Sequence, residues 1–123
     1  MYFDPNKKLH DLIIKAGGYC NAHSHLDRAY TITEQNLNDV VYNHLHEKWI
    51  YVDGYKAEAS EEQYYNNMSK ALINQISYGT TSCLSFIDID YVAGYRALRA
   101  AHSIKKDFEG QIEFKIACQT LKG

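Results

Sequence analysis

Two histidines two residues apart, His23 and His25, are the residues of this sequence whose type and spacing best suit metal chemistry. Side chains at positions i and i+2 stand on one face of a strand, so a strand here directs both imidazoles to the same side. Residues 19–22 are uncharged and follow two glycines, which is typical of a buried strand after a turn. A bare pair of this kind also arises by chance and is then solvated or hydrogen-bonded, so the surrounding residues decide between the two interpretations.

Neutral imidazole is a ligand for zinc and for ferrous iron. The metal lowers the pKa of a bound water towards about 7, and the hydroxide formed can attack an sp2 carbon at neutral pH. We therefore expect His23 and His25 to bind a divalent metal, zinc or iron. His44 and His46 have the same spacing but fall in an expected helix, where two residues correspond to about 200° around the axis and the rings point apart.

Three aspartates lie near the ends of expected strands. Asp27 follows the histidines and either accepts a hydrogen bond from a metal-binding histidine or caps its own loop. Asp88 and Asp90 are two residues apart at the end of the second expected strand, so their side chains are expected on the same face. Asp90 is expected to cap the next helix, whereas Asp88 is, with Asp27, a candidate to support the metal ligands. Arg28 is expected to pair with a carboxylate.

The elements that must position these residues alternate between helix and strand. Apolar spacing, caps and glycine stops predict helices over residues 5–16, 36–51, 61–78 and 92–108, and strands over residues 19–26, 79–90 and 112–119. Residues 53–54, Asp-Gly, are expected to end the second helix. Strands that alternate with helices indicate an α/β protein with a parallel sheet.

Three segments resemble a known family. The string at residues 23–28, His-Ser-His-Leu-Asp-Arg, resembles the first-strand signature of the amidohydrolase superfamily, most closely that of its cytosine-deaminase-like branch. Residues 79–90 resemble the second barrel strand of that branch, and residues 119–123 resemble the loop with a glutamine and a glycine after its third strand. The three matches are collinear with the family. The sequence departs from it at Phe86, where the family often has a histidine.

The resemblance implies a fold and a set of site residues. The fold is the first three β/α units of a TIM (β/α)8 barrel, and residues 1–123 are expected to be the N-terminal part of it, because a whole barrel takes about 250 residues. His23 and His25 are then the first two metal ligands, and Gln119 is a candidate to bind the substrate. The remaining ligands and the catalytic acid–base group are expected beyond Gly123.

The activity implied is that of a metal-dependent amidohydrolase or deaminase. Such an enzyme hydrolyses a C–N bond of a cyclic amidine or amide, for example a nucleobase-like ring. The full-length protein is expected to be the enzyme, and the chain of 123 residues alone to be inactive. The alternative is a truncated remnant or an interaction piece without activity of its own.

Composition restricts the possible partners. A net charge of −2 without a basic cluster argues against a nucleic-acid surface, and no apolar run is long enough to span a bilayer. Three scattered cysteines without a Cys-x-x-Cys spacing do not form a disulfide framework. We therefore expect a cytoplasmic protein whose partner is a small-molecule substrate. The composition leaves the oligomeric state open.

Overall fold

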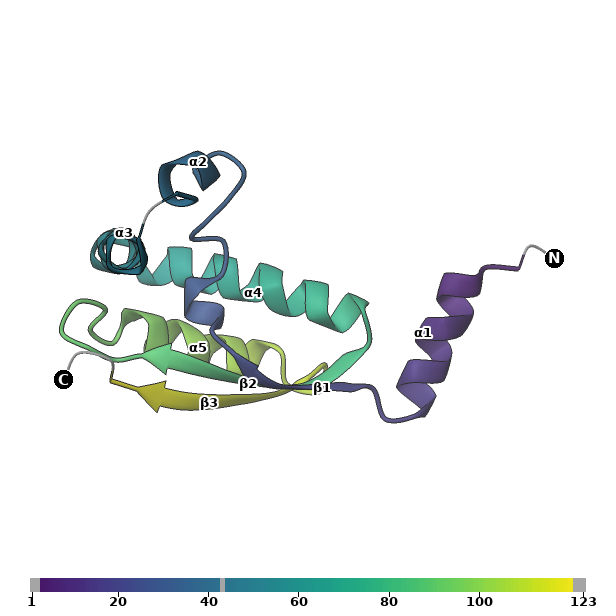
Figure 1. The fold of residues 1–123 in the computed structure, drawn as a ribbon. Helices are drawn as coiled ribbons and strands as arrows, with labels where there is room; N and C mark the ends of the chain where they lie inside the picture. Colours follow the sequence, from purple (N-terminus) through teal and green to yellow (C-terminus); the bar gives the residue numbers. More distant parts are fainter. Residues whose placement is uncertain (1–2, 43, 121–123) are drawn as a thin grey trace.

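The computed structural model describes residues 3–42 and 44–120. The elements along the chain (Figure 1) are α1 (Pro5–Lys15), β1 (Tyr19–Ser24), the short 3-10 helix η1 (Leu26–Arg28), α2 (Leu37–Val40), α3 (Leu45–Glu58), α4 (Glu61–Ser77), β2 (Thr80–Asp88), α5 (Arg96–Asp107) and β3 (Glu113–Gln119).

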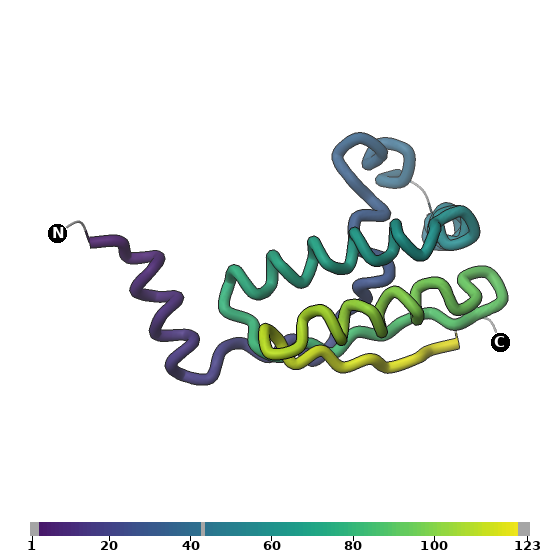
Figure 2. Tube along the Cα trace, turned by 180° about the vertical axis from the view of Figure 1, so that it is seen from behind, coloured from purple at the N-terminus to yellow at the C-terminus, as the bar shows by residue number. Residues whose placement is uncertain are grey.

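The three strands form one parallel sheet in the order β1-β2-β3. Helices α4 and α5 contact each other and both contact β2, so they cover the same face of the sheet (Figure 1 and Figure 2). Strands β2 and β3 pair in a regular register that ends with Asp88 opposite Gln119. Strand β1 pairs with β2 through two register shifts. The regular β2–β3 register therefore brings the last residues of these two strands side by side.

The core lies between the sheet and the helices α4 and α5. Tyr64, Met68 and Leu72 of α4 are spaced by four residues and all buried, which agrees with the apolar spacing that predicted a helix over residues 61–78. In α5 the buried residues include Ala97 and Ala101, whose small side chains allow the helix to approach closely. Burial of apolar surface, at about 25 cal/mol per Å², holds both helices against the sheet.

The prediction of three β/α units of a TIM barrel is wrong. The described residues form a small α/β domain with a three-stranded parallel sheet and five α-helices in mixed order. Among the described residues one helix precedes β1, and three α-helices and the 3-10 helix η1 lie between β1 and β2, so the elements do not repeat as β/α units. Apolar periodicity identifies single elements, whereas the number of helices in a crossover and the closure of a sheet have no local signal.

The expected helix over residues 36–51 is divided in the structure between α2 and α3. Helix α3 then continues through Gly54, where the sequence predicted a break, and ends at Glu58. A glycine inside a helix costs about 1 kcal/mol relative to alanine. The buried side chain of Lys56, one half-turn further on, contacts the carboxylates of Asp88 and Asp90, so this part of α3 makes tertiary contacts.

Helix α1 forms as predicted but contributes little to the core. Asp4 caps its first turn by accepting hydrogen bonds from two backbone amides, and Pro5 occupies the first helical position. No residue of this helix is buried, and the helix projects away from the sheet in Figure 1. Its exposed large apolar side chains are Leu9, Leu12 and Ile14. Within residues 3–42 and 44–120, no helix combines the length and the apolar character needed to span a membrane.

Candidate functional site

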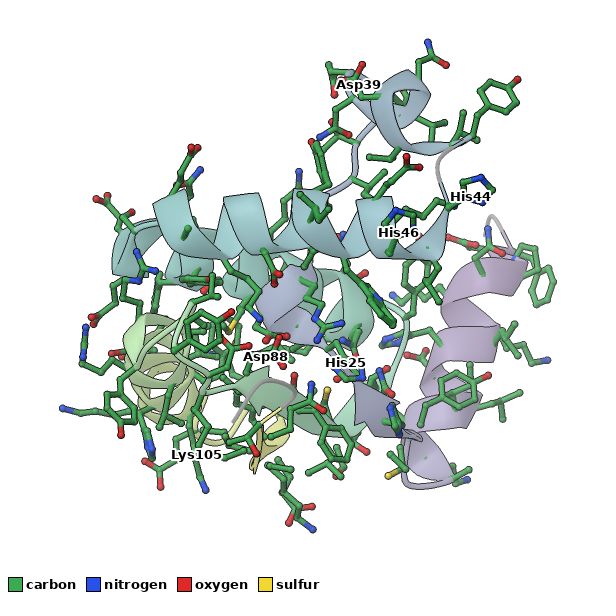
Figure 3. The ribbon with its side chains drawn as sticks, turned by 60° about the vertical axis from the view of Figure 1, so that its left-hand side comes forward. His25, Asp39, His44, His46, Asp88 and Lys105 are labelled. Carbon is green, nitrogen blue, oxygen red and sulfur yellow. The ribbon has the colours of Figure 1, made fainter. Side chains whose placement is uncertain are left out.

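The polar side chains predicted for the site meet at the carboxyl ends of the three strands. Strand β1 carries His23, with His25 directly after its end, β2 ends in Asp88, and β3 ends in Gln119. Figure 3 shows the side chains of His25 and Asp88 close together at this edge. Because the strands are parallel, their carboxyl ends lie at one edge of the sheet, which is where ligands bind in open α/β sheets.

The rings of His23 and His25, the histidine pair, converge. Their Nε2 atoms are 3.3 Å apart, a distance at which two neutral imidazoles can share a hydrogen bond. Two nitrogen ligands of a tetrahedral zinc ion, each about 2.0–2.1 Å from the metal, are also about 3.3–3.4 Å apart. The ring of Phe86 packs against both imidazoles, with centroid distances of 4.8 Å to His23 and 5.6 Å to His25. The pair therefore fits two adjacent positions of a tetrahedral metal.

The histidine pair supplies part of a metal site. Within the two described stretches of the chain, no group of three or more His, Cys, Asp or Glu side chains is placed to hold a metal ion. Catalytic zinc usually has three protein ligands. Burial, and then the proximity of the Arg28 guanidinium and the His23 imidazole, lower the pKa of His25. This shift favours the neutral ring, which is the form that binds a metal.

Asp88 is buried and contacts three side chains. Its Oδ2 lies 2.8 Å from Nη2 of Arg28 and 3.1 Å from Nζ of Lys56. Its Oδ1 accepts a hydrogen bond of 2.7 Å from Nε2 of Gln119. Burial acts to raise the pKa of Asp88, but the hydrogen bonds from Arg28 and Lys56 outweigh burial and lower the pKa below its ordinary value. Asp88 therefore stays charged, and the predicted pairing of Arg28 with a carboxylate is confirmed.

Lys56, from α3, was not predicted as part of the site, because no motif surrounds it. Its side chain is only 4% exposed, and its Nζ contacts Asp90 as well as Asp88. Burial acts to lower the pKa of Lys56, but Asp90 and Asp88 outweigh burial and raise it. Asp90 also accepts hydrogen bonds from two backbone amides in the turn before α5. The prediction that Asp90 caps the next helix is therefore wrong: the N-cap of α5 is Tyr95, and Asp90 holds the turn that precedes it.

Asp27 is buried, with 4% of its surface exposed. Its Oδ2 accepts a hydrogen bond of 2.9 Å from the backbone amide of Asp88. Its Oδ1 is buried without a hydrogen-bond partner among the described residues. Burial raises the pKa of Asp27 to about 6. Two roles were predicted, a loop cap or an acceptor for a histidine, and these contacts show neither: Asp27 joins the loop after β1 to the end of β2.

Gln119 lies between Asp88 and the histidine pair. Its Nε2 is 2.7 Å from Oδ1 of Asp88 and 3.2 Å from Nδ1 of His25. The candidate substrate-binding residue is thus placed beside the candidate metal ligands. The loop predicted after it includes residues 121–123, which lie outside the described residues.

His44 and His46 lie at the start of α3, apart from His25 in Figure 3. The prediction that their rings point apart is wrong, because the rings are stacked, with centroids 6.2 Å apart and planes 8° from parallel. His44 is the N-cap of α3 and has extended backbone angles. Helical geometry therefore does not govern the direction of its side chain.

Comparison with known proteins adds one relative. No family model matches the chain. The chain is similar to an uncharacterized protein of Haemophilus influenzae (strain ATCC 51907 / DSM 11121 / KW20 / Rd), with 39% identity over 115 residues. The match covers 94% of this chain and 42% of that protein. The chain therefore spans less than half the length of this relative.

Proposed function

We propose that this chain contributes the metal-binding strand of a metal-dependent amidohydrolase or deaminase, which hydrolyses a C–N bond of a cyclic amidine or amide such as a nucleobase-like ring. The observation that carries the proposal is the separation of 3.3 Å between Nε2 of His23 and Nε2 of His25. This separation suits two ligands of a tetrahedral zinc ion, each at about 2.0–2.1 Å. The location at the carboxyl ends of parallel strands supports it further.

The residues of this chain have distinct roles in the proposal. His23 and His25 hold a divalent metal, zinc or iron, which when bound supplies a hydroxide nucleophile near neutral pH. Phe86 packs against both imidazoles and restricts the orientations of the two rings. The amide of Gln119, 3.2 Å from His25, is placed to bind the amide or amidine edge of the substrate.

The proposal requires further groups from a longer protein. A catalytic zinc site usually has a third protein ligand, and proton transfer to the leaving nitrogen needs an acid–base group. The relative from Haemophilus influenzae is long enough to supply such groups, because the match covers only 42% of it. We propose that this chain is the N-terminal portion of such an enzyme and that the remaining groups follow it.

We also place the protein in the cytoplasm, with a small molecule as its substrate. All three cysteines are free thiols, of which Cys83 is buried while Cys20 and Cys118 are exposed. Exposed free thiols persist in a reducing compartment, which supports this location.

The test combines metal analysis with an assay of ammonia release on the full-length protein. His23→Ala and His25→Ala each remove a ligand, so bound zinc or iron and the release of ammonia from cyclic amidines should both be lost. The control is the double variant His44→Ala with His46→Ala, which should keep both. Unchanged metal content in the two single variants would contradict the proposal. A full-length protein that neither binds metal nor releases ammonia would favour the alternative, a non-catalytic remnant or interaction piece.

A further inference from the structure

The side-chain amide of Gln119 contacts two acceptors through the same nitrogen. Its Nε2 donates to Oδ1 of Asp88 over 2.7 Å and lies 3.2 Å from Nδ1 of His25. An amide NH2 group has two hydrogens and no free acceptor site. One hydrogen therefore points to Asp88 and the other to His25, and Nδ1 of His25 must accept it.

The orientation of this amide is determined by the charge of Asp88. The carboxylate lies between two cations, with Nη2 of Arg28 at 2.8 Å and Nζ of Lys56 at 3.1 Å from its Oδ2, so it is ionised and can only accept hydrogen bonds. If the amide of Gln119 were turned over, its carbonyl oxygen would face a carboxylate oxygen without a hydrogen between them. The NH2 group must therefore face Asp88, and the hydrogen-bond network fixes an assignment that would otherwise be ambiguous.

The protonation of both imidazoles follows from this orientation. A neutral imidazole has one N–H and one bare nitrogen. Because Nδ1 of His25 accepts from Gln119, the proton of that ring is on Nε2. This Nε2–H then donates across the 3.3 Å to Nε2 of His23, whose own proton is on Nδ1. The hydrogen bonds thus run in one direction, from Gln119 through His25 to His23.

This tautomer is unsuited to the metal site. A metal that binds the pair through both Nε2 atoms needs a lone pair at Nε2 of His25, and the proton of that ring must then be on Nδ1. An Nδ1–H would face the NH2 group of Gln119, and two donors cannot share a hydrogen bond. We propose that Gln119 opposes metal loading at the histidine pair, and that a metal binds only when the Gln119 amide turns away from His25.

The inference rests on the proposed metal site and adds a regulation to it. On loading, His25 releases the proton on Nε2 to solvent and takes up one proton on Nδ1, so the charge of the ring does not change. The Gln119 amide that turns away keeps Asp88 as a possible partner and becomes available to a substrate. Gln119 therefore acts on the metal through His25, as a positioning residue. Its side-chain amide has one orientation in the metal-free protein and another in the loaded protein.

The first measurement needs no metal. Full-length protein labelled with ¹⁵N in histidine is studied by NMR under mildly alkaline conditions, where the nitrogen shifts distinguish a protonated ring nitrogen from a bare one. We expect the metal-free protein to show His25 protonated on Nε2 and His23 protonated on Nδ1. In Gln119→Leu the preference of His25 for Nε2–H should weaken. Protonation of His25 on Nδ1 in the metal-free wild-type protein would overturn the inference.

The second measurement is a zinc titration of the same proteins. Gln119→Leu removes a hydrogen bond that must be broken on loading, so zinc should bind about threefold to tenfold more tightly than to the wild-type protein. Gln111→Leu, at an exposed glutamine remote from the pair, is the matched control and should bind zinc as the wild-type protein does. Gln119→Ala is a second variant if the leucine disturbs the strand end.

The outcomes separate the inference from the proposed function. Zinc that binds through the histidine pair equally tightly in the wild-type protein and in both Gln119 variants overturns the inference and leaves the metal site in place. Zinc that binds to none of these proteins overturns the metal site, and the inference with it. Tighter binding in the Gln119 variants, together with a change of His25 to Nδ1–H on loading, supports both.

Discussion

Lys56 of α3 and Asp88 at the end of β2 form a buried ion pair, with Nζ 3.1 Å from Oδ2 and side chains that are 4% and 1% exposed. The same ammonium group also contacts Asp90. This pair fixes a helix to the edge of the sheet that carries the histidine pair. A buried ion pair adds less to stability than its Coulomb energy implies, because both charges lose their hydration, but removal of one partner leaves an uncompensated charge.

Lys56→Met should therefore destabilise the protein strongly. The substitution leaves Asp88 and Asp90 buried without this cation, and we expect a loss of about 3–5 kcal/mol in the free energy of unfolding. Chemical denaturation measures the loss. The control is Lys106→Met at an exposed position of α5, where a change within about 0.5 kcal/mol is expected. Similar losses in the two variants would show that the ion pair is not the cause.

The carboxylates of Asp88 and Asp90, whose pKa values are lowered, predict a loss of stability in acid. The pKa of Asp90 is below its ordinary value, because its hydrogen bonds to two backbone amides and to Lys56 outweigh its burial. A carboxylate with a lowered folded-state pKa contributes its stabilisation above the unfolded-state pKa of about 3.9 and loses it as the pH falls through the folded-state value. Unfolding at a series of pH values should show this decline.

Asp90→Asn isolates the contribution of one carboxylate to this decline. The variant cannot gain or lose the negative charge, so it should be less stable than the wild-type protein at neutral pH and approach it in acid. Asp11→Asn, at an exposed position of α1, should follow the wild-type curve throughout. A constant difference between Asp90→Asn and the wild-type protein at every pH would contradict this explanation.

Two glycines should respond to alanine in opposite directions. Gly54 lies inside α3, its φ is not positive, and a Cβ there meets nothing within 4 Å, so Gly54→Ala should stabilise the protein by about 0.5–1 kcal/mol. Gly79 has a φ of +91°, and a Cβ there would lie 2.9 Å from Cγ2 of Ile13. Gly79→Ala should therefore destabilise by about 1–3 kcal/mol. Thermal unfolding of the two variants checks both signs.

Phe86→Ala should weaken zinc binding at the proposed site. The ring of Phe86 packs against both imidazoles, and without it the histidine pair must be ordered when the metal binds. We expect a loss of roughly tenfold in zinc affinity, measured by titration of the full-length protein. Leu84→Ala, two residues earlier on the same strand, is the control and should leave the affinity nearly unchanged. Equal losses in the two variants would show that support by Phe86 is not specific.

The parts of the site that the sequence predicted depend on local rules. His23 lies on β1 and His25 directly after its end, and the two converge because residues two apart in extended backbone share a face. The buried stripe of α4, with Tyr64, Met68 and Leu72, follows from helical spacing in the same way. Gln119 was named only through the family resemblance, and its approach to His25 follows from the parallel sheet, whose strands have their carboxyl ends at one edge.

The parts that were missed depend on contacts between segments far apart in the chain. Lys56 resembles an exposed helical lysine in sequence, and its burial depends on its contacts with Asp88 and Asp90, which are more than 30 residues away in the chain. The continuation of α3 through Gly54 has the same cause, because tertiary contacts override a modest helix propensity. The barrel was predicted wrongly since the collinear matches carry no information about how many helices a crossover contains.

The backbone amide of Asp88 donates a hydrogen bond to Oδ2 of Asp27 at the carboxyl ends of the strands, and its hydrogen exchange can report on this edge of the sheet. The acceptor of this amide is a side chain, so exchange of its hydrogen with deuterated solvent depends on opening of the buried polar cluster. Amides in the middle of β2 exchange only when the sheet itself opens. A molecule that binds at the strand ends would therefore slow exchange at the Asp88 amide selectively, which makes occupancy of the site readable at a single backbone position.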